Sequence, residues 1–425
     1  MKRLSIDQIS GVLPAMEELR PFLDQVLLVS EPDLERHWAG SGELGTVGGR
    51  FVDSEKLGEV LDEALAEHRR RIESLYGSVG AALRAMAEED RAGAAAALLQ
   101  AGEREWRSGR PRWAEALAEA AARVGASLPD QATVFSAQLM VARTARLLGD
   151  RRTARLRYET AARIAEQTGN RSGAATAHVG LGNLAVDRGL WADALRHYEE
   201  AESRVDPAAA NGHGWQIALN RSIVAREEGR LDDCEALLSN ARRLIPERAE
   251  HGGSQAILDN AEGQLLRARG RLKEAEVAFR RALEATDDPE GHVTIAVNLA
   301  EVLLALGAEM EAGKYARQAE LQALEAGVVR RLPEVYRVLG RVAAARGHAD
   351  AFVFHERALE IIRERSLPQV ELALVQEAYG ELDHARGETE TGIARLEEAM
   401  GIFENLGFAT ARARVTELLR RLEGG

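Results

Sequence analysis

The 425-residue sequence is poor in cysteine, proline and aromatic residues, and each shortage excludes a class of protein. Its single cysteine, Cys234, cannot form an internal disulfide, which excludes a small secreted scaffold held together by disulfides. Only 10 prolines and 4% aromatic residues accompany 45% apolar residues, whereas strands would favour more Val, Ile, Thr and Tyr. The composition therefore predicts an all-α protein.

Long apolar runs and an excess of basic residues are also missing. No stretch approaches 18 uncharged apolar residues, so we expect no transmembrane helix. Asp7 and Gln8 interrupt the place where a secretory signal needs a continuous apolar run. The net charge of -13 does not supply the basic field that nucleic acids or anionic lipids attract. We expect a cytoplasmic protein that binds neither nucleic acid nor membrane.

A glycine recurs about every 40 residues and reveals an internal repeat. Spacings of 40, 40, 40, 41, 37, 40 and 40 separate Gly109, Gly149, Gly189, Gly229, Gly270, Gly307, Gly347 and Gly387. Each glycine follows an apolar helical pattern and precedes a few polar residues and a second such pattern. This is typical of a glycine that ends a helix in a tight turn. The repeat unit is therefore a helical hairpin.

Small residues recur at fixed distances from each turn glycine. Seven residues before it stand Gly102, Ala142, Gly182, Ser222, Gly263, Ala300, Gly340 and Gly380. The second helix carries a small, a large and another small residue, as in Ala194, Tyr198 and Ala201. The unit at Gly347 fits if its turn is one residue shorter, which puts His355 in the place of the large residue. Small residues allow two helix backbones to approach, so these positions predict the contacts within each hairpin.

This pattern resembles the tetratricopeptide repeat, and eight copies cover roughly residues 94–422. The resemblance implies a right-handed α-solenoid of stacked antiparallel helical hairpins, a tetratricopeptide-like superhelix. The period near 40 departs from the usual repeat of about 34 residues, and we assign the surplus to longer helices or to linkers such as 203–214. HEAT and armadillo repeats are the alternative, but they do not require these glycines and alanines.

Motifs that could indicate catalysis or cofactor binding have structural explanations. Gly180 and Gly182 match the spacing of a dinucleotide-binding turn but lie inside a predicted helix, whereas such a turn must join a strand to a helix. His348 and His355 come nearest to metal-ligand spacing, and we interpret them as surface or packing residues. Cys234 replaces an alanine of the repeat and is expected to be buried rather than reactive. We expect no enzyme activity, no cofactor and no metal.

The sequence before the repeats has two parts. Residues 1–52 read as short helices followed by a glycine-rich loop, 39–50, which lacks the Lys-Ser/Thr ending of a phosphate-binding loop. Residues 53–90 read as one long helix, and residues 91–425 as the solenoid. Apolar residues at three- and four-residue steps over 61–86 form a coiled-coil-like seam. The seam either caps the solenoid or pairs with a second chain as a homodimer.

One face of the first helices carries a recurrent set of polar residues. Three- and four-residue spacing aligns positions 2, 5, 6, 9, 12 and 13 of each repeat, where position 8 is the small residue. We call the following residues the polar stripe: Arg143, Arg146, Asn183, Asn220, Arg226, Asn260, Gln264, Arg267, Asn298, Glu301, Arg337 and Arg341. The tetratricopeptide resemblance implies that this stripe lines a concave groove for peptides or partner helices. The alternative is a solvated polar surface.

The chemistry of the polar stripe suits a peptide ligand. An asparagine side chain can pair with both the C=O and the N–H of an extended backbone, and arginine suits carboxylates or phosphates. We therefore predict a non-catalytic interaction scaffold or adaptor that binds an acidic peptide or partner protein. The alternative is a peptide-sensing regulator, similar to bacterial regulators with such repeats, in which the groove controls pairing of the N-terminal region.

Overall fold

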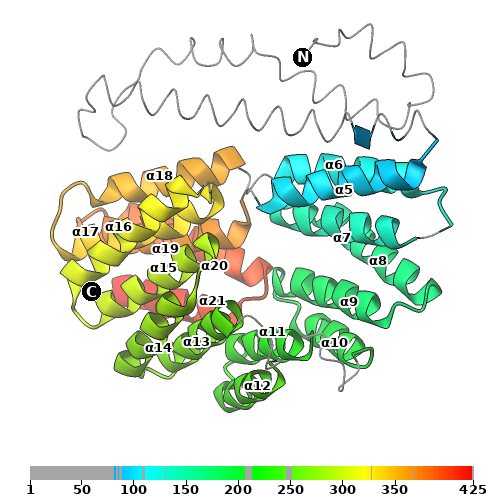
Figure 1. Cartoon of the computed structure of the whole chain (residues 1–425). Coiled ribbons are helices and arrows are strands. Elements are labelled where there is room, and N and C mark those ends of the chain that lie inside the picture. Colours follow the sequence, from blue (N-terminus) through cyan, green and yellow to red (C-terminus); the bar gives the residue numbers. More distant parts are fainter. Residues whose placement is uncertain are drawn as a thin grey trace, which may run out of the picture. The chain divides into compact units, whose positions relative to one another are not determined.

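The computed structural model describes residues 81, 82, 85, 89–107, 111–129, 131–205, 213–245, 251–326, 328–365 and 367–423. Within these residues the chain forms α-helices, one 3₁₀ turn and no strand (Figure 1). It divides into two compact units, residues 1–144 and 145–425. The N-terminal helices predicted in 1–52, most of the long helix 53–90 and its seam lie outside the described residues.

Over residues 91–423, sixteen helices follow one another in pairs, and a last helix ends the described array. The first unit holds α5 (Arg91–Arg107), α6 (Pro111–Gly125) and most of α7 (Ala132–Leu147). The second unit continues with α8 (Arg151–Gln167), α9 (Arg171–Val186), α10 (Trp191–Glu202), α11 (His213–Glu227), α12 (Leu231–Leu244), α13 (His251–Ala268), α14 (Leu272–Ala285), α15 (Pro289–Ala305), α16 (Glu309–Glu325), η2 (Val329–Arg331), α17 (Leu332–Ala345), α18 (Ala351–Arg365), α19 (Gln369–Ala385), α20 (Thr389–Asn405) and α21 (Ala409–Glu423). The predicted all-α solenoid of hairpins is confirmed.

The recurrent glycines that the structure describes end the first helices of their hairpins. Seven of the eight have a positive φ, from 63° at Gly189 to 85° at Gly387, and Gly109 lies outside the described residues. At Gly189 the amide of Leu190 donates to the carbonyl of Ala185 at 3.0 Å, which satisfies an orphan carbonyl at the helix end. A side chain would be strained in this left-handed conformation, so glycine recurs there.

The small residues of the repeat lie against the large residue of the second helix, as predicted. A Cβ atom added to Gly263 would come within 2.6 Å of the Phe279 ring, and one added to Gly182 would overlap the ring of Tyr198. Gly180, on the same helix α9, would meet Tyr158 of α8. Both glycines of the suspected dinucleotide motif are therefore packing residues within a helix.

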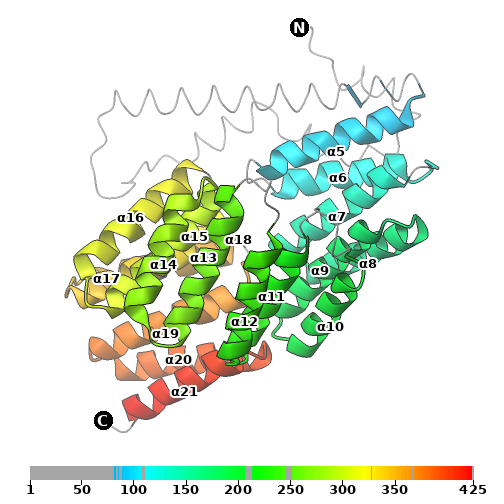
Figure 2. The ribbon, with the colours of Figure 1, turned by 60° about the horizontal axis from the view of Figure 1, so that its bottom comes forward.

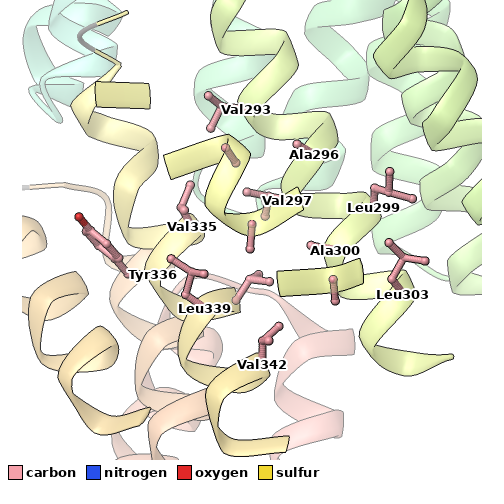
Figure 3. Packing of buried hydrophobic residues seen from close by; sticks show 14 of the residues in the cluster. Val293, Ala296, Val297, Leu299, Ala300, Leu303, Val335, Tyr336, Leu339 and Val342 are labelled. Atoms are coloured by element: carbon pink, nitrogen blue, oxygen red, sulfur yellow. The ribbon is translucent and has the colours of Figure 1, made fainter. Parts of the chain in front are cut away.

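Stacking of hairpins makes a continuous core in the second unit. One cluster of buried residues runs from Ala256 on α13 to Leu382 on α19. Figure 3 shows its centre, where Val297 and Ala300 of α15 face Val335 and Leu339 of α17. Each repeat buries its apolar face against its neighbours, as expected for a solenoid.

Candidate functional site

The first helices of the hairpins form one face of the second unit, which we call the inner face. Each of α9, α11, α13, α15 and α17 contacts the first helix of the next hairpin. Second helices of successive hairpins contact one another less extensively, so the array curves with its first helices inside (Figure 2). The stripe residues from Asn183 to Arg341 lie on these helices. Arg146 lies at the end of α7, and Arg143, on the same helix, belongs to the first unit.

Amide side chains occupy the inner face from α9 to α15, and most have one partner. Asn183 accepts a hydrogen bond from the Tyr198 hydroxyl at 2.7 Å. The side-chain amide of Asn298 donates to the oxygen of Asn260 at 2.9 Å, which joins α15 to α13. Asn220 is half-buried and has no side-chain hydrogen bond among the described residues. The amides therefore retain hydrogen-bonding groups that the fold does not use.

Four of the six arginines of the stripe are paired with acidic or amide residues, mostly of the next repeat: Arg146, Arg226, Arg267 and Arg337. Arg146 makes a bidentate ion pair with Asp187, with N–O distances of 2.5 and 2.8 Å. Arg226 donates to Gln264 and to Glu227, the latter at 2.7 Å. The pairing neutralises much of the positive charge that the repeated arginines suggested.

Glu301 lies between two arginines in the most buried part of the stripe. Its carboxylate accepts hydrogen bonds from Arg267 of α13 and from Arg337 of α17, the latter at 2.5 Å. The side chains of Glu301 and Arg337 are each only 12% exposed. Burial raises the pKa of Glu301, but Arg337 and Arg267 outweigh it and hold that pKa well below its usual range. The hydrogen bonds of Arg267, Glu301 and Arg337 join the three successive first helices α13, α15 and α17.

Sequence reasoning missed Asp187, and it placed Glu301 in the polar stripe without recognising it as the partner of Arg267. Asp187 and Glu301 follow Arg146 and Arg267 by 41 and 34 residues, about one repeat, and this offset is the signal that could have revealed them. It also missed Glu371 of α19, where burial and the charge of Glu334 raise the pKa to about 8. The inner face is therefore amide-rich from α9 to α15 and a charged lattice from α15 to α19.

Arg341 differs from the other arginines of the inner face. Its side chain is exposed on α17 and makes no ion pair or hydrogen bond with a described residue. Its positive charge nevertheless helps to lower the pKa of Glu301 and opposes the rise in the pKa of Glu381 that burial causes. Arg143 of the first unit is likewise exposed and unpaired among the described residues. These two guanidinium groups can donate hydrogen bonds to a carboxylate of another molecule.

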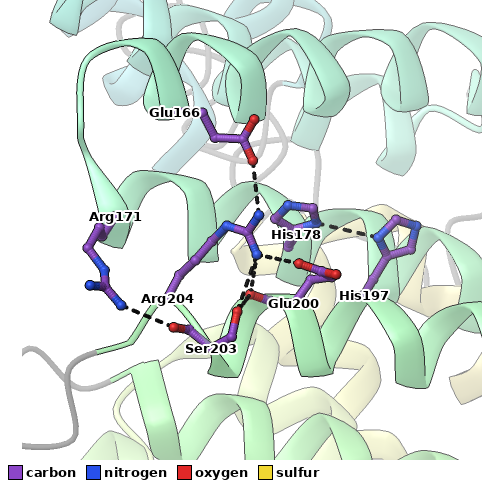
Figure 4. A network of polar contacts seen from close by, with 7 residues as sticks. All are labelled: Glu166, Arg171, His178, His197, Glu200, Ser203 and Arg204. Atoms are coloured by element: carbon purple, nitrogen blue, oxygen red, sulfur yellow. Dashed lines mark hydrogen bonds and ion pairs between the residues drawn. The ribbon is translucent and has the colours of Figure 1, made fainter.

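A second polar network joins α8, α9 and α10 (Figure 4). Arg204 donates to Glu166 at 3.0 Å and to Glu200 at 2.5 Å. Beside it the Nδ1 atoms of His178 and His197 lie 3.5 Å apart. Burial is the largest cause that lowers the pKa of both imidazoles. No group of three or more metal-ligating side chains occurs in the part of the chain that the structure describes.

The other chemically notable residues have packing roles. His355 is fully buried, stacks on Tyr379 with ring centroids 5.2 Å apart, and lies against Gly340. It takes the place of the large residue in its repeat, as predicted, whereas His348 is exposed. Cys234 is buried, and burial raises the pKa of its thiol, which disfavours the reactive thiolate. Among the helices described, none is long and apolar enough to span a bilayer.

Comparisons with known proteins agree with this architecture. No protein-family model matches the sequence, and neither does any curated protein. The structure is similar to that of a Rap protein complexed with Competence and Sporulation Factor, with a TM-score of 0.50 and 14% identity over 78% of this chain and 98% of that one. It is also similar to a Rap conjugation regulator of plasmid pLS20 in complex with the Phr* peptide, with a TM-score of 0.46 and 18% identity over 61% of this chain and 78% of that one.

A third similar structure is a thermophilic tetratricopeptide protein from Thermus thermophilus, with a TM-score of 0.36 and 27% identity over 48% of this chain and 98% of that one. At these identities the likeness concerns the fold. In its repeat pattern and its architecture, the described chain is a tetratricopeptide-like α-solenoid.

Proposed function

We propose that the inner face binds an extended peptide or a peptide-like segment of a partner protein, and that the chain acts as a non-catalytic adaptor. One observation carries this proposal: Asn220 offers an unpaired amide at the centre of a row of amide side chains on α9–α15. An amide can pair with both polar groups of a peptide unit, and successive amides can follow an extended backbone without reading its sequence. A row of this kind suits main-chain recognition.

The proposed ligand carries a carboxylate. Arg146, Arg226 and Arg267 are engaged within the fold, so they contribute little free positive charge. Arg341 is available, and a guanidinium group binds a carboxylate in a bidentate manner. We therefore place an acidic side chain or the C-terminal carboxylate of the ligand at α17.

A regulatory role is the second candidate. The similar Rap structure is a complex with Competence and Sporulation Factor, and a shared fold supports such a role here by analogy only. In this form of the proposal, peptide binding on the inner face changes the pairing of the N-terminal 90 residues. A peptide-dependent change of molecular mass in light scattering would support the regulator, and a constant mass on peptide binding would support the adaptor.

A library of linear peptides, displayed on phage and selected on the immobilised full chain, tests the proposal. Peptides that the protein selects should bind Asn220→Ala more weakly, by roughly 5- to 150-fold, because losing the amide leaves a peptide group unpaired at about 1 to 3 kcal/mol. Gln318→Ala removes an exposed amide from α16 and is the matched control. Equal affinities for both variants and the wild type, measured by titration calorimetry, would exclude the inner face as the site.

A further inference from the structure

Two hairpin turns that are far apart in the sequence meet in the second unit. The turn at Gly189, between α9 and α10, lies against the turn at Gly407, between α20 and α21. The hydroxyl of Thr410 donates to the carbonyl of Glu227 at 2.7 Å, across 183 residues of sequence. In Figures 1 and 2 the beginning of α21 accordingly lies beside the helices that follow α9. The array of hairpins therefore closes on itself between residues 189 and 410.

The contact is made by backbone and by one aromatic pair. A Cβ atom added to Gly189 would overlap the carbonyl of Leu406, and one added to Gly407 would lie 3.1 Å from the carbonyl of Gly189. Trp191 meets Phe408 edge to face, with centroids 5.4 Å apart and an interplanar angle of 82°. The same glycines that end helices in a left-handed conformation thus let the two turns touch.

This closure is weaker than the contacts between neighbouring repeats. Trp191 and Phe408 are only half-buried, and Thr410 is exposed, whereas neighbouring hairpins share fully buried residues such as Leu299 and Val335. No ion pair joins the two turns among the described residues. Contacts with little buried apolar area and exposed hydrogen bonds belong to the parts of a protein that open most readily.

We propose that Gly189, Trp191, Gly407, Phe408 and Thr410 form a latch, which closes the inner face into a ring and opens without unfolding of the repeats. A solenoid bends at many interfaces, because each repeat contacts only its neighbours, so release of one end contact lets the array widen. Opening gives an extended ligand lateral access to the amide row. This last consequence rests on the proposed function; the latch itself does not.

Distance measurements on the ligand-free full chain test the latch. Spin labels at Glu199→Cys on α10 and Arg420→Cys on α21, in a Cys234→Ala background, report the separation of the two helices that leave the latch. The wild-type latch should give a short-distance population, and Gly189→Ala should shift it to longer, broader distances. Gly229→Ala is the matched control, because Gly229 has a similar φ of 75° but nothing within 4 Å of an added Cβ. It should retain the short distance.

A second variant distinguishes opening of the latch from misfolding of the Gly189 turn. Phe408→Ala combined with Thr410→Val removes the aromatic pair and the hydrogen bond but leaves both glycine turns intact, and it should open the array in the same way. Unchanged circular dichroism in the opened variants shows that the repeats persist. A short-distance population that survives in both Gly189→Ala and the double variant would overturn the latch, as would its absence from the wild type.

Whether the ligand enters through the latch is tested by a separate measurement, the association rate of a peptide. A bismaleimide cross-link between Ala192→Cys and Ala409→Cys, both at exposed positions beside the latch, should markedly slow the association of a library-selected peptide. An unchanged association rate would refute access through the latch. If no peptide is selected, the proposed function fails while the distance measurements still decide the latch.

Discussion

Gly182 sets the distance between two helices because it has no side chain. Its Cα faces the ring of Tyr198, which is fully buried, and the added Cβ atom of any other residue would overlap that ring. Protein interiors are close-packed, so the second helix can accommodate a larger residue only by moving.

We expect Gly182→Leu to lower the free energy of unfolding by roughly 1 to 3 kcal/mol or more, which is the range for overpacking. Gly253→Ala is the control, because Gly253 is exposed on α13 and nothing lies within 4 Å of the added Cβ. That change should be neutral or stabilising by up to about 1 kcal/mol, as alanine is the better helix former. Equal urea midpoints for Gly182→Leu and the wild type would mean that the repeat register is wrong.

His355 should make stability depend on pH. Burial, reinforced by Arg337, Arg341 and Arg395, lowers its pKa to about 3 in the folded chain. In the unfolded chain the pKa of this histidine is about 6.5, so below that pH the unfolded chain binds a proton that the folded chain does not bind. Stability is therefore lost as the pH falls through about 6.5, by about 1.4 kcal/mol per unit.

We expect the His355→Phe variant to lose about 2 kcal/mol less than the wild type between about pH 7 and about pH 5, from the same linkage relation. Urea unfolding at the two pH values measures this difference. His348→Gln changes an exposed histidine of the same hairpin and serves as the control. An identical pH response in the wild type and His355→Phe would show that the buried imidazole does not titrate as stated.

At the scale of helices, the charged lattice ties successive first helices together. Arg337 of α17 and Glu301 of α15 are a buried ion pair, and removing one partner leaves a charge without compensation in a poorly solvated place. An exposed pair on one helix, such as Arg155 and Glu159, is solvated with or without its partner.

Arg337→Met should therefore destabilise the protein by about 3 to 5 kcal/mol, the range for breaking a buried pair. Arg155→Met should change the free energy of unfolding by less than about 1 kcal/mol. Denaturant unfolding of both variants and of Glu301→Gln provides the measurement. Near-equal effects of Arg337→Met and Arg155→Met would mean that water enters the lattice.

At the scale of the whole molecule, the seam predicted in 61–86 remains a prediction, because nearly all of it lies outside the described residues. Its last described member, Ala82, is buried in the cluster with Ala94 and Leu98. Replacing both Ile72 and Val79 by Asp puts two charges on the seam. If the seam joins two chains, light scattering should show a dimer that the double change dissociates. A lower melting temperature at constant mass would instead show that the seam caps the solenoid.

The amino-acid sequence determined the repeat and its hairpin, because the information is local. A helix-ending glycine, a small residue seven positions before it and an alanine five positions after it act through contacts within one hairpin, so a fixed spacing is enough to recognise them. The stripe could also be aligned in this way, since three- and four-residue steps place residues on one helix face. His355 was assigned correctly because the register of its repeat could be counted from Gly347.

Only the tertiary structure decided which of these groups remain available. Arg146, Arg226 and Arg267 occupy the same repeat position and looked equivalent, yet each meets a partner that depends on how the neighbouring hairpin is rotated. The meeting of Gly189 with Gly407 depends on the sum of the rotations across the intervening repeats. Each rotation is small and arises from the packing of many side chains, so no short pattern in the sequence encodes their sum.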